Sequence, residues 1–130
     1  MKRIVLLLAL CILMAACGSS SGRQQVVLTA DKSGSDVALE LTNRMDTALD
    51  YNLCASVLQR RNEGSWLNVP VEDEDCTAQR GTLQPGRSVK YTKKLPAFLE
   101  TFGAGTYRYE TRVEQPAGTE VRVASNSFDR

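Results

Sequence analysis

The sequence of 130 residues predicts an all-β fold, a single antiparallel β-sandwich of seven or eight short strands. Apolar and polar residues alternate in most segments after Val26, as they do in strands with one buried face. Short clusters of Gly, Pro, Asn, Asp and Ser separate these segments, and the period of a long helix is absent from them. Regularly spaced short strands with turn residues between them are typical of a sandwich.

The first half of the chain contains four predicted strands. Alternating segments occupy 26–30, 37–42, 49–57 and 66–69, and we expect 49–57 to form one long strand. Turn residues fill the intervals between these segments, and Asn62-Glu63-Gly64-Ser65 has the composition of a hairpin turn.

The second half begins with a predicted loop, formed by Pro70 and the acidic run Glu72-Asp73-Glu74-Asp75. Leu83-Gln84-Pro85-Gly86 is predicted to turn, because Pro presets φ and Gly accepts a positive φ. Further strands are predicted at 89–95, with Val89, Tyr91 and Leu95 facing inward, at 107–114 and at 121–128. A longer connection, 96–105, has room for one short helical turn.

The amino-terminal residues have the layout of an export signal. Lys2 and Arg3 precede an almost unbroken apolar run from Ile4 to Leu13, which is shorter than the roughly 20 residues that a membrane-spanning helix needs. Small residues follow, then Cys17 and a Gly- and Ser-rich stretch.

The segment Met14-Ala15-Ala16-Cys17 resembles a bacterial lipoprotein signal. The resemblance implies that residues 1–16 are a signal peptide and that Cys17 is lipidated, with 17–25 as a tether of roughly 15 Å. More than one acyl chain gives stable anchoring. The alternative is an ordinary secretory signal cleaved after Ala16, which leaves Cys17 unmodified.

The signal prediction assigns different roles to the four cysteines of the chain. Cys11 leaves with the signal and Cys17 takes the lipid, so Cys54 and Cys76 remain. Outside the cytoplasm two remaining cysteines are most simply a disulfide. A reactive thiol pair is the alternative, but the chain has neither a CxxC motif nor a histidine that would lower a thiol pKa.

Several short motifs in residues 26–128 together resemble bacterial immunoglobulin-like (Ig-like) domains, a group that includes the intracellular proteinase inhibitor-like domains. They are Leu41-Thr42-Asn43, Tyr51-Asn52-Leu53-Cys54, Cys76-Thr77, Leu83-Gln84-Pro85-Gly86, Gly105-Thr106-Tyr107-Arg108 and Ser125-Asn126-Ser127-Phe128. The resemblance implies an Ig-like sandwich over 26–130 and no catalytic residues.

Two details depart from antibody domains. Cys54 has the opposite parity from Leu53 and Tyr51, so we expect its bond to point away from the core and to join a strand to the acidic loop. Tyr107 fits either a tyrosine corner or a residue that simply lines the core.

Composition excludes several function classes. The chain has no histidine, which removes the commonest general base, and it has no P-loop, GxSxG or dinucleotide motif. Without Lys2 and Arg3 of the predicted signal, the 16 basic residues fall to 14 against 15 acidic ones, and a net charge of about −1 gives no electrostatic basis for binding nucleic acid. We therefore predict no catalytic residue, no cofactor and no small-molecule substrate. No metal site is predicted either, although the sequence leaves open whether Glu72 to Asp75 holds an ion.

Candidate contact residues lie in the 96–105 connection. Phe98, Leu99 and Phe102 form a partner-contact patch if they are exposed together, and the alternative, which we favour, is that they close one end of the sandwich. Arg60-Arg61 and Lys93-Lys94 are expected to face solvent.

The sequence predicts a non-enzymatic, membrane-anchored module of the cell envelope that binds or scaffolds an envelope protein. It would lie on the periplasmic side of the outer membrane in a Gram-negative cell, or on the outer face of the plasma membrane otherwise. A proteinase inhibitor is the alternative, with 96–105 or 72–76 as the inhibitory loop. An envelope enzyme that uses carboxylates is the third reading and the least favoured.

Overall fold

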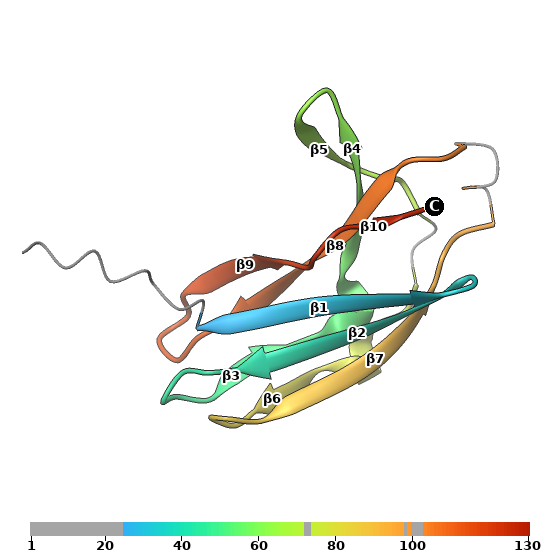
Figure 1. The fold of residues 1–130 in the computed structure, drawn as a ribbon. Helices are drawn as coiled ribbons and strands as arrows, with labels where there is room; N and C mark the ends of the chain where they lie inside the picture. Colours follow the sequence, from blue (N-terminus) through green and yellow to red (C-terminus); the bar gives the residue numbers. More distant parts are fainter. Residues whose placement is uncertain (1–24, 72–73, 98, 100–102) are drawn as a thin grey trace, which may run out of the picture.

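The computed structural model describes residues 25–130 except 72–73, 98 and 100–102, and it confirms the all-β sandwich (Figure 1). The predicted signal peptide, Cys17 and all of the tether except Gln25 lie outside the described residues. Within the described part of the chain, no helix is long and apolar enough to cross a bilayer. The elements of this part are β1 (Val26–Ser33), β2 (Asp36–Asn43), β3 (Leu49–Tyr51), the 3₁₀ helix η1 (Leu53–Ala55), β4 (Val57–Asn62), β5 (Ser65–Asn68), the 3₁₀ helix η2 (Thr77–Gln79), β6 (Gly81–Leu83), β7 (Ser88–Lys94), β8 (Thr106–Glu114), β9 (Glu120–Ala124) and β10 (Phe128–Asp129).

These strands form two antiparallel sheets. The small sheet has the order β1-β2-β7, and the large sheet has the order β5-β4-β8-β3-β6, with β9 and β10 also paired to β8. In the described residues there are more strands than the seven or eight predicted, because β3, β6 and β10 have only two or three residues each. Such short strands leave almost no alternation in a sequence.

The core lies between the two sheets. Alternate residues of β1 and β2 face it, and a two-residue turn at Gly34, whose φ is 61°, joins these strands. From the large sheet Tyr107, Tyr109 and Val113 pack against them. Burial raises the pKa of Tyr109 well above its usual value, and the charge of Glu74 adds to this.

Tyr107 lines the core and forms no tyrosine corner. It is fully buried, and its hydroxyl has no hydrogen-bond partner in the described residues. The corner requires a hydrogen bond from this hydroxyl to the backbone. Its ring instead stacks on Phe128 of β10, with 6.4 Å between the ring centroids.

The predicted long strand over 49–57 is wrong, because the chain leaves the sheet between Tyr51 and Val57. Asn52 caps η1: its side-chain oxygen accepts a hydrogen bond from Ala55 N. β3 pairs with Val113 and Glu114 of β8, whereas β4 pairs with residues 107–110. β9 pairs with residues 110–114 of the same strand, so β3 and β4 share the opposite edge of β8. Two short strands, β3 and β4, with η1 between them, therefore take the place of the continuous strand that was predicted.

Asn126 caps the backbone of Ala30 on the free edge of β1. The backbone N–H of Ala30 donates to Asn126 Oδ1 at 2.8 Å, and Asn126 Nδ2 donates to the carbonyl of Ala30 at 2.9 Å. Because β1 is an edge strand of the small sheet and Asn126 follows β9 of the large sheet, this amide also links the two layers.

Candidate functional site

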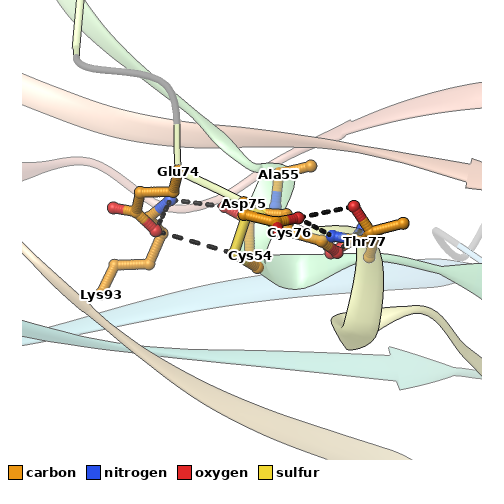
Figure 2. The surroundings of a disulfide bond; sticks show 8 residues. Cys54, Ala55, Glu74, Asp75, Cys76, Thr77 and Lys93 are labelled. Atoms are coloured by element: carbon orange, nitrogen blue, oxygen red, sulfur yellow. Dashed lines mark hydrogen bonds and ion pairs between the residues drawn. A yellow bond between two sulfur atoms is a disulfide. The ribbon is translucent and has the colours of Figure 1, made fainter.

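Cys54 and Cys76 form a disulfide, as predicted, with Cα atoms 5.4 Å apart (Figure 2). Cys54 lies in η1, and Cys76 is the residue before η2. Cys54 is buried but is not a member of the main hydrophobic cluster, and the bond joins η1 to the residue that precedes η2. The prediction that it fastens the acidic segment is correct, but its other end is a helix and not a strand.

Lys93 corrects the prediction that the 93–94 pair faces solvent. Its side chain is 9% exposed, and its ammonium donates to the carbonyl of Cys54 at 2.5 Å and lies 3.7 Å from Glu74 Oε2 (Figure 2). Lys93 belongs to the small sheet and Cys54 to a connection of the large sheet, so this contact ties the two layers beside the disulfide. The carbonyl of Cys54 and the carboxylate of Glu74 offset the free-energy cost of burying the Lys93 ammonium.

The described part of the acidic segment provides no cation site. A carboxylate oxygen of Glu74 lies within 4.8 Å of the sulfurs of Cys54 and Cys76, but these sulfurs are bonded to each other and are not thiolates. Asp75 accepts hydrogen bonds from the hydroxyl and the backbone N–H of Thr77, and these bonds lower its pKa. Glu72 and Asp73 lie outside the described residues.

Of the three candidate contact residues, Leu99 is fully buried in the core. Its backbone N–H donates to the carbonyl of Pro96 at 3.0 Å. The hypothesis of an exposed contact patch is therefore wrong for Leu99, which closes the sandwich instead. Phe98 and Phe102 lie outside the described residues.

A hollow lies beside the interruption at η1. β4 stops pairing with β8 at Glu110, and β3 starts at Val113, so Thr111 and Arg112 have a strand partner only on the β9 edge. A groove of about 800 Å³ opens across this gap, and residues from β3, η1, β4, β5, β6, β8 and β9 line it. Beside the gap, the buried hydroxyls of Thr111 and Ser56 have no hydrogen-bond partner in the described part of the chain.

The groove has a mostly polar lining. Trp66 on β5 contributes from the outer face of the large sheet. Tyr51 on β3 also borders the groove, but it pairs with Val113 and packs against the core. The remaining lining residues are Asp50, Asn52, Ala55, Val57, Gln59, Asn68, Arg80, Gly81, Thr82, Glu110, Arg112, Val113, Glu114, Glu120 and Arg122.

Sequence reasoning missed this groove, although one signal for it was present. The outward residues of β8 alternate with the core residues, and they mark a polar sheet face. That several strands combine into one concave surface follows from their pairing, which local patterns do not predict.

Several solved structures are similar to this chain, and three of them are described here. The Northeast Structural Genomics Consortium target SoR45 is 14% identical, with a TM-score of 0.48, and the match covers 80% of this chain and 81% of that chain. A Bordetella pertussis protein described as ApaA is 17% identical, with a TM-score of 0.45, over 80% of this chain and 87% of that chain.

The archaellum periplasmic stator protein FlaG from Sulfolobus acidocaldarius is 23% identical, with a TM-score of 0.42, over 76% of this chain and 98% of that chain. All three TM-scores are below 0.5, so these similarities do not indicate a function. No curated protein matches the sequence.

The family comparison agrees with the two-layer fold. The model of the bacterial Ig-like domain matches residues 23–127, which is most of the chain and nearly all of the described sandwich. The chain therefore belongs to the bacterial Ig-like domain family.

Proposed function

We propose that this is a lipid-anchored protein of the bacterial cell envelope, whose Ig-like domain binds or scaffolds a partner without catalysing a reaction. The groove of the large sheet is the observation that carries the binding role. It gathers polar and charged side chains from several strands beside Trp66.

Two features support a non-enzymatic role. The chain has no histidine. Tyr109, the one described group whose pKa is raised strongly, faces the core and does not line the groove. Catalytic groups usually combine a shifted pKa with a position in a cleft.

The anchor is supported by Lys2 and Arg3, the apolar run and the small residues before Cys17. Replacing Cys17 by serine is expected to abolish membrane association, because the serine variant cannot form the thioether on which lipidation begins. Fractionation of cells that express the full chain measures the effect. A variant that stays with the membranes at the wild-type level would show that Cys17 is not the anchor.

The groove can be tested directly by photo-crosslinking in cells. A photoreactive residue at Arg112, in the groove, is expected to capture the partner, whereas one at Lys90 is not. Lys90 is a suitable control, because its side chain is 74% exposed and it lies on β7 of the small sheet. Equal capture from both positions, or capture from Lys90 alone, would contradict a binding role for the groove.

Proteinase inhibition is a second candidate function. One observation favours it: the segment at Cys76 is held by the disulfide and by a hydrogen bond of 2.8 Å from Asn52 Nδ2 to the carbonyl of Cys76, while the neighbouring Glu74 and Asp75 stay exposed. A held, exposed loop is what an inhibitor presents to a protease. Inhibition assays of the full chain against serine, cysteine and metalloproteases test this function. The absence of inhibition in all three classes would rule it out.

A further inference from the structure

The outer edge of β5 has no partner strand in the described residues, because β5 is the end strand of the large sheet. In the ladder between β4 and β5, the backbone N–H of Val69 donates to the carbonyl of Leu58 at 2.8 Å. Backbone groups alternate between the two sides of an antiparallel strand, so those of Trp66 and Asn68 point away from β4. Two N–H and two C=O groups therefore line this edge.

This edge also lacks the features that usually discourage pairing, such as charged side chains, proline or a cap. The residues of β5 are Ser-Trp-Leu-Asn, and none is charged. The other edges in the described part of the chain differ. β7 carries three lysines, β9 carries a glutamate and an arginine, Asn126 caps Ala30 on β1, and β6 and β10 have only three and two residues.

An exposed leucine lies at the centre of the same strand. Among the described residues, Leu67 and Val71 are the exposed large apolar side chains, at 52% and 42%. Leu67 has the parity of Val69, which is buried in the core. The hairpin of β4 and β5 projects from the sandwich, away from the small sheet (Figure 1). Leu67 therefore continues the apolar face of this segment beyond the region that the core covers.

We propose that the β5 edge pairs with the β5 edge of a second copy of this chain, antiparallel, about a two-fold axis at Leu67. In this register Trp66 lies opposite Asn68 of the second copy, so the outward residues exchange four backbone hydrogen bonds. Leu67 lies opposite Leu67 of the second copy at a non-hydrogen-bonded position, where facing side chains are closest. Each exposed leucine is then covered by its counterpart.

The two ends of the strand select this register. A shift in one direction would bring the hairpin turn into the ladder, where Glu63 and Gly64 have positive φ values of 48° and 84°. A shift in the other direction would bring in Pro70, which has no N–H. The uncharged strand also selects the occupant, since it brings no like charges together in a self-pair and gives an acidic or basic peptide no opposite charge to bind.

This pairing is a closed contact, because a two-fold axis uses the same edge of both copies. It involves only the four residues of β5 in each copy, so the dimer is weak and forms where copies are concentrated. In dilute solution the contact is absent, and Leu67 then adds nothing to the stability of the monomer. The inference goes beyond the proposed function, since it does not use the groove, and capture of a partner from Arg112 tests that function separately.

Cysteine cross-linking in cells tests the register. The full chain is expressed with Leu67→Cys and oxidised with copper phenanthroline, and we expect a disulfide-linked species of twice the mass of the chain on a non-reducing gel. Ser65→Cys is the matched control, because it is exposed on the same face of β5 but lies roughly 13 Å along the strand from its counterpart in this register. The parent chain shows any linkage through the native cysteines.

Three outcomes would overturn the proposal. They are no linkage from Leu67→Cys above that of the parent chain, equal linkage from Leu67→Cys and Ser65→Cys, and linkage of Leu67→Cys to a protein of another mass. The last outcome would mean that a different protein occupies this edge.

A second substitution distinguishes strand pairing from chance collision. Asn68→Pro removes one outward N–H from each copy and places a ring on the edge, so in the Leu67→Cys chain it is expected to lower the linked fraction by about tenfold. The β4–β5 ladder does not use this N–H, and unchanged protease resistance would confirm that the variant is folded. An unchanged linked fraction in the folded variant would contradict strand pairing at this edge.

Discussion

Removing the Cys54–Cys76 disulfide is expected to lower the free energy of unfolding by about 3 kcal/mol. The two cysteines are 22 residues apart in the sequence, and closing a loop of this length restricts the unfolded chain by about that amount in the chain-entropy model. Urea unfolding of the variant Cys54→Ala/Cys76→Ala measures the loss.

Reduction provides the control for this prediction. A dithiol reductant is expected to destabilise the wild-type protein to a similar extent and to leave the double variant unchanged. A loss well below 1 kcal/mol in both experiments would mean that Lys93 and Asn52 hold the corner without the covalent bond.

Replacing Leu99 by alanine is expected to cost about 2–5 kcal/mol, the usual range when a fully buried leucine is truncated. Leu99 is 0% exposed and belongs to the core cluster, although it comes from a connection between strands. Urea unfolding of the full chain again gives the measurement.

Leu67→Ala is the matched control for Leu99→Ala. Leu67 is 52% exposed, so its loss should change the stability by no more than about 0.5 kcal/mol. If Leu99→Ala were equally mild, Leu99 would not be a core residue, and its role as a partner contact would need to be considered again.

The sequence was sufficient to predict the two-layer fold, because the large alternating segments carry it. The strand β8 alternates buried Tyr107, Tyr109, Thr111 and Val113 with more exposed residues, and β1 and β2 show the same rule. The disulfide was predictable as well, from the count of cysteines outside the predicted signal peptide and lipidation site.

The break between β3 and β4 could not be predicted from alternation. Leu53 keeps the parity of a strand residue, yet the side chain of Asn52 accepts from Ala55 N and favours a 3₁₀ turn instead. Lys93 was missed for a different reason. It shares its parity with Val89, Tyr91 and Leu95, but a lysine ammonium usually stays in solvent. The partner that makes its burial tolerable, the carbonyl of Cys54, lies 39 residues away in the sequence.

The amide of Asn126 would have a consequence for this protein if it is held on a membrane by one end, as we propose. Tethered copies would diffuse in two dimensions close to the membrane, so their exposed sheet edges would meet repeatedly. An unblocked edge strand is a template for pairing with another chain. By occupying both backbone groups of Ala30, Asn126 takes the place that a neighbouring β1 would need, and it favours a crowded layer of separate molecules over a continuous sheet.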